Sequence, residues 1–226
     1  MTIVDVPQRS PAWHEARLGR LTGSRAAAML ATIKTGEAAA RRSLRVALVL
    51  ERLTGRSQDG GYQSPAMRDG IAREPDARAR YEALTGLLVA ETGFLVHETI
   101  LAGCSLDGHL GTLGTDDAGI LELKAPTPAV HLATLDRREV PAEYFPQVLH
   151  NLWISGARWC DWLSYSPDFP DRLQAVLIHV ERDDQAVAAY ASKATAFLEE
   201  VAIETARVAQ LGAPPDGAPI APALRA

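Results

Sequence analysis

The spacing of apolar side chains is helical through the first third of the chain. Apolar residues recur every three or four positions from 11 to 86, as they do on the buried face of an amphipathic helix. Ser10 followed by Pro11 is a typical helix start, and Gly55 and Gly86 are typical stops. We therefore expect four helices: residues 11–18, a second helix capped by Thr22 or Ser24 and running through residue 33 (24–33), then 36–55 and 65–85, with a loop over 55–64.

After Gly86 the pattern changes to short apolar runs separated by turn residues, which is typical of strands. Strands are expected within 87–98, 100–108, 119–126, 157–166 and 173–183, and helices over 128–136, 141–156 and 184–210. This order predicts an α/β fold, a single domain with a central mixed β-sheet flanked by helices. The domain is assigned to residues 1–211, and the Pro-, Gly- and Ala-rich segment 212–226 is expected to be a disordered tail.

Composition excludes several classes of protein. The 226 residues are 47% hydrophobic, which suffices for a core without stabilising disulfides. Cys104 and Cys160 lie far apart, so neither a disulfide framework nor a cysteine-rich metal site is expected. No apolar run approaches the ~18 residues of a membrane span. We expect a cytoplasmic protein that does not bind membranes.

The net charge of −5 conceals an asymmetry along the chain. Residues 1–82 hold 14 Lys and Arg against 9 Asp and Glu, whereas residues 83–226 hold 9 against 19. All but one of the basic residues in the first part are arginine, the side chain suited to bidentate contact with phosphate. Two interpretations stay open at this point: an ordinary solvated helix surface, or a basic face for a polyanion.

The most informative stretch for chemistry is Glu122-Leu123-Lys124, which lies in an expected strand. Side chains alternate between the two faces of a strand, so Glu122 and Lys124 project together. A hairpin through 111–117 would bring Asp107 beside Glu122. Two convergent carboxylates form a hard-oxygen site of the kind that Mg²⁺ prefers. An adjacent lysine could orient or deprotonate a metal-bound water.

This D…E-x-K pattern is the signature of the PD-(D/E)xK nucleases, but the pattern alone is weak. An exposed Glu122–Lys124 pair on a solvent face is the simpler interpretation. Asp107 also follows Leu106, where the superfamily name expects proline. This departure costs little, because proline contributes no ligand.

Five ordered segments strengthen the case. They are PAWHEARLGRLTGS at 11–24, REPDARARYEALTG at 73–86, SLDG around Asp107, ELKAP at 122–126 and PAEYFPQVLHNLWISG at 141–156. Together they resemble the phage lambda exonuclease or YqaJ-type viral recombinase family, from about residue 11 to 182. The resemblance implies a restriction-endonuclease-like core.

The resemblance also implies roles for single residues. Metal ligands would be Asp107, Glu122, the carbonyl of Leu123 and the helical acid Glu74, with Lys124 assisting the attacking water. A second set would contact DNA or the water: Arg17 and Ser24 would grip the 5′-terminal phosphate, Tyr144 would bind DNA, and Gln147 would lie near the attacking water or the scissile phosphate. The loop at 33–37 carries only Lys34, which puts a basic DNA-guiding segment there in doubt.

The activity implied by the resemblance is a Mg²⁺-dependent exonuclease of phage or prophage recombination that degrades double-stranded DNA from a 5′-phosphorylated end. Mn²⁺ is expected to substitute for Mg²⁺. The family forms ring-shaped homotrimers that enclose DNA, and it works with a single-strand annealing recombinase. Two alternatives stay open: an endonuclease on the same core, either restriction-like or junction-resolving, and a non-catalytic module that binds DNA ends.

Structural roles remain possible for three of these residues. Arg17 could pair with Glu15, Glu74 could form an ordinary helix-surface pair with Arg78, and Gln147 could be a buried polar group bonded to backbone.

Overall fold

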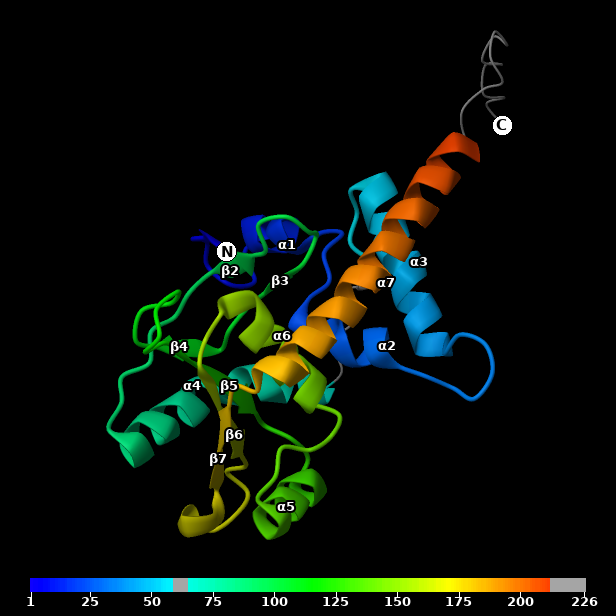
Figure 1. The fold of residues 1–226 in the computed structure, drawn as a ribbon. Helices are drawn as coiled ribbons and strands as arrows, with labels where there is room; N and C mark the ends of the chain where they lie inside the picture. Colours follow the sequence, from blue (N-terminus) through cyan, green and yellow to red (C-terminus); the bar gives the residue numbers. More distant parts are fainter. Residues whose placement is uncertain (59–64, 212–226) are drawn as a thin grey trace, which may run out of the picture.

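A four-stranded mixed sheet forms the centre of the fold (Figure 1). Its strands, in spatial order, are β4 (Gly108–Leu110), β5 (Gly119–Lys124), β6 (Trp159–Tyr165) and β7 (Ala175–Glu181). The pair β5 and β6 is parallel, and the other two pairs are antiparallel. Parallel neighbours need a long crossover, which here contains two helices. The predicted mixed sheet is therefore confirmed.

The computed structural model describes residues 1–58 and 65–211, except for the side chains of 65–67. The tail predicted over 212–226 lies outside the described residues, as does most of the loop predicted over 55–64. The boundary of the predicted domain at residue 211 stays a prediction. In the described part of the chain, no helix is long and apolar enough to cross a membrane.

A second, smaller sheet departs from the expectation of one sheet. It joins β1 (Thr2–Val4), β2 (Phe94–Val96) and β3 (Gly103–Cys104) in antiparallel register. These strands have only two or three residues, so the apolar alternation is too short to show which strands pair. The result is a small sheet that anchors the N-terminal segment beside the strands of the centre.

The described helices follow the expected order, most of them with ends one to four residues from those expected. They are α1 (Pro11–Arg17), α2 (Ala26–Leu30), α3 (Ala39–Thr54), α4 (Pro65–Thr85), α5 (Pro128–Arg137), α6 (Phe145–Ser155) and α7 (Asp184–Leu211). The helix predicted over 24–33 is wrong in extent, because a 3₁₀ turn (Gly23–Arg25) precedes a short α2. The Thr22 side chain makes no capping hydrogen bond to the 3₁₀ turn that follows it. At Ala31 the backbone becomes extended, which ends α2.

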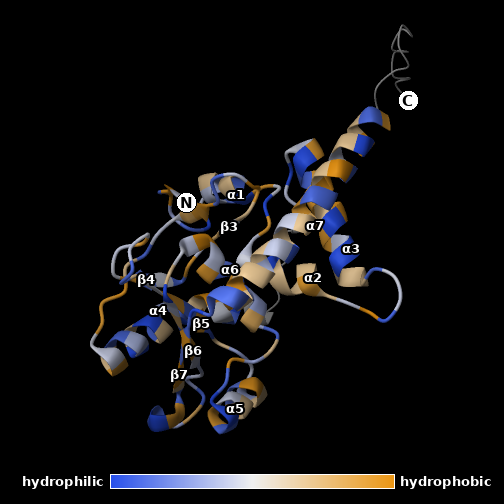
Figure 2. Cartoon of the chain, viewed as in Figure 1, coloured by the Kyte–Doolittle hydropathy of each residue, from blue (hydrophilic) through white to orange (hydrophobic). Residues whose placement is uncertain are grey.

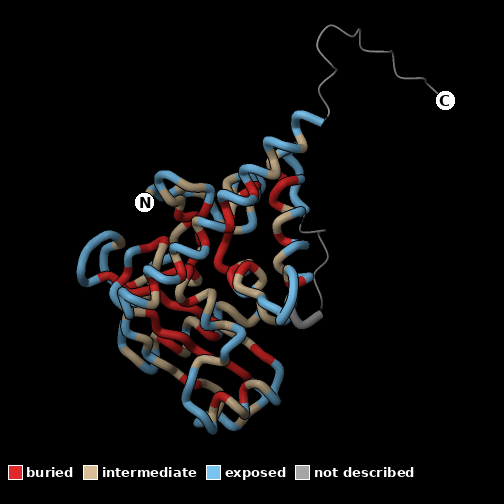
Figure 3. The backbone as a smooth tube through the Cα atoms, turned by 45° about the vertical axis from the view of Figure 1, so that its right-hand side comes forward, coloured by how far each residue is buried: buried red, intermediate tan, exposed pale blue. Residues whose placement is uncertain are grey.

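Helices cover both faces of the central sheet. On one face, Leu121 and Leu123 of β5 pack with Ala77 and Tyr81 of α4. On the other, Ile120 joins the larger core with residues of α6 and α7. The buried residues follow the central strands (Figure 3).

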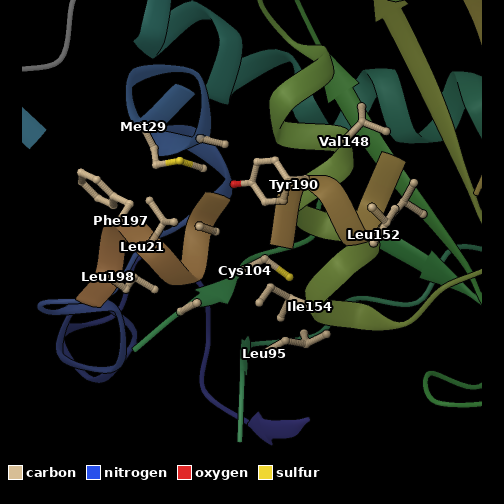
Figure 4. Packing of buried hydrophobic residues seen from close by; sticks show 14 of the residues in the cluster. Leu21, Met29, Leu95, Cys104, Val148, Leu152, Ile154, Tyr190, Phe197 and Leu198 are labelled. Atoms are coloured by element: carbon tan, nitrogen blue, oxygen red, sulfur yellow. The ribbon is translucent and has the colours of Figure 1, made fainter. Parts of the chain in front are cut away.

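The larger core lies where α6 and α7 meet α2 and the small sheet. Figure 4 shows Val148 and Leu152 of α6, Tyr190 and Phe197 of α7, and Cys104 of β3 among its members. Hydrophilic and hydrophobic residues are mixed along α3 and α7, which pack against each other (Figure 2). Side chains alternate between the two faces of β5, so its even-numbered residues point toward α6. This face of the sheet carries the candidate chemistry.

Candidate active site

Asp107 directly precedes β4 and lies beside Glu122 of the neighbouring strand β5. The register of β4 and β5 pairs Gly108 with Leu121, which puts Asp107 opposite Glu122. The backbone N–H of Leu123 donates a hydrogen bond of 2.7 Å to Oδ2 of Asp107. The hairpin expected from the sequence therefore forms and brings the two carboxylates together.

The Glu122 carboxylate is buried, with a side-chain exposure of 1%. Its Oε1 accepts hydrogen bonds from the Lys124 ammonium and, at 2.5 Å, from Nε2 of Gln147. Its Oε2 accepts a hydrogen bond of 2.9 Å from Nδ2 of Asn151. The simpler interpretation, an exposed Glu–Lys pair on a solvent face, is therefore wrong, and Gln147 bonds a carboxylate instead of backbone.

Burial and charge act on the two ionisable groups in opposite directions. Burial raises the pKa of Glu122 above its ordinary value; the Lys124 ammonium opposes this shift, and the Asp107 carboxylate adds to it. Burial alone would lower the pKa of Lys124, but the carboxylates of Glu122 and Asp107 outweigh it and raise that pKa. Lys124 is therefore held as an ammonium in this arrangement.

A cleft of about 510 Å³ opens beside this cluster. Six of the residues selected from the sequence line it: Ser24, Glu74, Leu123, Lys124, Tyr144 and Gln147. They come from the 3₁₀ turn, from α4, from β5 and from the start of α6. The ring of Tyr144 lies 5.7 Å from the Lys124 ammonium, a cation–π contact.

Glu74 reaches the cleft from α4, where its carboxylate pairs with a cation. Its Oε2 accepts a 2.5 Å hydrogen bond from Nη2 of Arg9. Arg78 instead pairs with Glu91 and donates a 2.9 Å hydrogen bond to the carbonyl of Asp107. The alternative of a simple Glu74–Arg78 surface pair is therefore not what the structure shows.

The donors at the cleft fit a hard divalent cation. Among the described residues, no group of three or more His, Cys, Asp and Glu side chains is arranged to hold a metal. Mg²⁺, however, is commonly bound through one or two carboxylates and keeps several waters. Asp107 and Glu122 supply two carboxylates, and Leu123, whose carbonyl is the third expected ligand, lines the cleft.

Arg17 is held by an aromatic ring and a hydroxyl. Its guanidinium lies 4.1 Å from the ring centre of Trp13 and donates a 3.1 Å hydrogen bond to Oγ of Ser105. Trp13 donates its indole N–H to the same oxygen at 2.9 Å. Arg17 lines a small hollow with Thr22, whereas Ser24 lines the cleft; the Thr22 and Ser24 hydroxyls are 3.3 Å apart.

Two residues of this region were not selected from the sequence. Asn151 lies one helical turn after Gln147, so a search for polar residues at i and i+4 on α6 would have found it. Ser105 lies two positions before Asp107, in the short segment that joins β3 to β4, and no pattern in the sequence singles it out. A Cβ on Gly23 would lie 2.5 Å from Oδ1 of Asn151, so the backbone next to Ser24 packs directly on this amide.

The sheet and its cluster define a class: an α/β fold in which an Asp lies against an E-x-K strand beside a cleft, as in PD-(D/E)xK nucleases. The family model described as YqaJ-like viral recombinase domain matches residues 12–158. The chain belongs to this family.

Solved structures agree with the assignment. The chain is similar to LHK-Exo, an alkaline exonuclease from Laribacter hongkongensis, with 33% identity and a TM-score of 0.79 over 89% of this chain and 97% of that one. The same protein in complex with dAMP gives a TM-score of 0.80 at the same identity and coverage. A phage-related exonuclease from Haemophilus somnus 129PT shares the fold, with 11% identity and a TM-score of 0.62 over 85% and 96% of the two chains. A search of curated proteins finds no match.

Proposed function

We propose that the protein is a Mg²⁺-dependent exonuclease that degrades double-stranded DNA in the 5′-to-3′ direction from a 5′-phosphorylated end. One observation carries the proposal: Asp107 and a buried Glu122–Lys124 pair meet beside a cleft. The similarity to an alkaline exonuclease supports it. That relative was solved with dAMP, a nucleoside monophosphate such as exonucleases release.

Asp107, Glu122 and the carbonyl of Leu123 would hold the cation, and Glu74 would complete the acidic shell from α4. When bound, a divalent cation neutralises the charge that develops on the phosphate during attack by water. Gln147 and Asn151 keep the Glu122 carboxylate oriented through hydrogen bonds to its two oxygens. Oriented ligands of this kind reduce the reorganisation needed during reaction.

Lys124 would act as a hydrogen-bond donor to the attacking water. Its raised pKa keeps the ammonium protonated beside Glu122 and Asp107, so donation is favoured over proton abstraction. Tyr144 covers the ammonium from the start of α6. Gln147, which bonds Glu122 and lines the cleft, would contact the same water or the scissile phosphate.

The 5′-terminal phosphate would be bound by Arg17 and Ser24. Arg17 is already fixed by Trp13 and Ser105, so little side-chain entropy remains to be lost on binding. Phosphate contacts carry no base information, so cleavage would not depend on sequence. The arginine-rich first part and acidic second part suit a homotrimeric ring around DNA that acts with a single-strand annealing recombinase in phage recombination.

The test is digestion of a linear duplex labelled at the 5′ or 3′ end of one strand, with Mg²⁺, with Mn²⁺ and with EDTA. The proposal expects immediate release of the 5′ label as mononucleotide with either metal, and no release in EDTA. A covalently closed circle should stay intact. Nicking or linearisation of the circle would support the endonuclease alternative, and binding of ends without digestion would support the non-catalytic one.

A further inference from the structure

Arg9 has a backbone conformation that non-glycine residues seldom adopt. Its φ is +67°, in the left-handed region where a Cβ crowds the following carbonyl. Glycine would take this conformation without that crowding. An arginine at such a position needs an explanation, and strained residues of this kind often lie at functional sites.

The turn that contains Arg9 is firmly attached to the strand region that carries the site. The N–H of Ser10 donates to the carbonyl of Pro7 at 3.1 Å, which closes the turn. The Gln8 amide donates to the carbonyl of Leu106 at 2.8 Å, directly before Asp107, and to that of Thr92 at 3.1 Å. The left-handed residue is therefore fixed in space beside the cluster.

The Arg9 side chain extends from this turn to α4 and bonds Oε2 of Glu74 at 2.5 Å. The two side chains are 45% and 30% exposed, and an ion pair with that exposure adds little to stability. Fold stability alone therefore gives little reason for an arginine where glycine would be relaxed. The partner, however, is the acidic residue that lines the cleft.

We propose that Arg9 is a positioning residue that fixes the Glu74 carboxylate at the wall of the cleft, for use as a ligand of the divalent cation expected there. This inference rests on the proposed function, in which Glu74 belongs to the acidic shell. The bond uses Oε2, and within the described chain no hydrogen bond reaches Oε1, which stays available to a cation or its water. Carboxylate ligands are commonly oriented by such a second hydrogen bond, and loss of the partner weakens metal binding by about 10-fold or more.

The decisive variant is Arg9→Gly, because it removes the guanidinium and also relieves the backbone. Its melting temperature should be no lower than that of the wild type. Arg138 provides a matched control: it is exposed, its φ is +54°, and it ends α5. Arg138→Gly gives the same relief without touching the cleft. Arg9→Lys keeps the positive charge and a hydrogen-bond donor. One donor is enough, because Glu74 accepts one hydrogen bond from Arg9.

Mn²⁺ affinity, measured by electron paramagnetic resonance on the full chain without DNA, is the main readout. We expect affinity to fall about 10-fold in Arg9→Gly, to stay near the wild-type value in Arg138→Gly, and to be largely restored in Arg9→Lys. In the DNA assay, Arg9→Gly should raise the Mg²⁺ concentration for half-maximal rate by a similar factor, with kcat at saturating Mg²⁺ nearly unchanged.

Unchanged Mn²⁺ affinity in Arg9→Gly would overturn the inference. Tighter binding would overturn it too, because Arg9 would then compete with the cation for Glu74. These outcomes are separate from a failure of the proposed function. A wild-type protein that binds Mn²⁺ but leaves DNA ends intact refutes the exonuclease, while the comparison of Mn²⁺ affinities still decides the role of Arg9.

Discussion

Asn151 donates its Nδ2 hydrogen to Oε2 of Glu122 across 2.9 Å, while its own Oδ1 is buried without a hydrogen-bond partner in the described structure. A buried amide with one unpaired oxygen is costly, because that oxygen has lost its water. The hydrogen bond from Nδ2 of Asn151 to the buried Glu122 carboxylate offsets this cost. The geometry therefore makes Asn151 a support for Glu122.

Replacing Asn151 by leucine should separate this support from mere packing. The side chain keeps a similar size but loses its donor, which leaves Oε2 of Glu122 without its partner. We expect a loss of about 1–3 kcal/mol in the free energy of unfolding, measured by urea denaturation in EDTA, together with slower DNA digestion. A variant as stable and as active as the wild type would show that Glu122 needs no donor at Oε2.

Asp107→Ala and Glu122→Ala should each abolish digestion and leave binding of DNA ends largely in place. Each change removes a carboxylate of the expected metal site, whereas the predicted phosphate contacts of Arg17 and Ser24 are on other elements. Ca²⁺ should support binding without turnover in the wild type, because it accepts looser geometry. If either variant keeps more than about a tenth of the wild-type rate, a barrier change under ~1.4 kcal/mol, the assignment is wrong.

Local patterns predicted the central part of this site for a physical reason. Alternation along one strand put Glu122 and Lys124 on one face, and a short hairpin limited where Asp107 could lie. Both are short-range constraints that the sequence expresses directly. The mixed sheet followed from the order of elements.

The remaining contacts depend on how distant elements pack. Arg9 meets Glu74 across 65 positions, and Trp13 meets Ser105 across 92. No periodicity links such pairs, because their approach is set by the docking of the N-terminal turn and α1 against α4 and the small sheet. The two-sheet arrangement was missed for the same reason.

His150 predicts a pH dependence of stability. Its ring is fully buried between the carbonyl of Gly103, 3.0 Å from Nε2, and the hydroxyl of Tyr190, 2.8 Å from Nδ1. Burial lowers its pKa to about 4, from an ordinary value of 6.5. The unfolded chain therefore binds a proton below pH 6.5 that the folded protein does not accept until about pH 4. Stability should fall as the pH drops through this window, by up to about 3 kcal/mol.

The measurement is urea denaturation of the wild type and of His150→Gln between pH 7 and pH 4. Glutamine can donate to one neighbour and accept from the other, so the variant should fold, and its stability should change less over this range. His14→Gln, a change at an exposed histidine, is the control and should keep the wild-type slope. Equal slopes in all three proteins would assign the acid sensitivity to other groups.

Arg17 should make digestion depend on the chemistry of the 5′ end. Its guanidinium is fixed over Trp13 and against Ser105, and it can offer charge-assisted hydrogen bonds to a terminal phosphate. A duplex with a 5′-hydroxyl lacks that anion, so the wild type should degrade it about 10-fold more slowly or worse, as hydrogen bonds to charged groups contribute about 1.5–3 kcal/mol. Arg17→Ala should lose most of this preference.

Initial rates for each enzyme on 5′-phosphorylated and 5′-hydroxyl duplexes form a double-mutant cycle, in which a large coupling energy identifies the contact. Arg20→Ala is the matched control, because Arg20 lies three positions further along and bonds the carbonyl of Ala16 at 3.0 Å. It should keep the preference. Mn²⁺ affinity should be the same in all three proteins, since the Arg17 guanidinium bonds Ser105 and lies over the ring of Trp13, and neither is a predicted metal ligand. If the wild type treats both ends alike, Arg17 does not recognise the end, and an endonuclease on this core becomes the better explanation of the cleft.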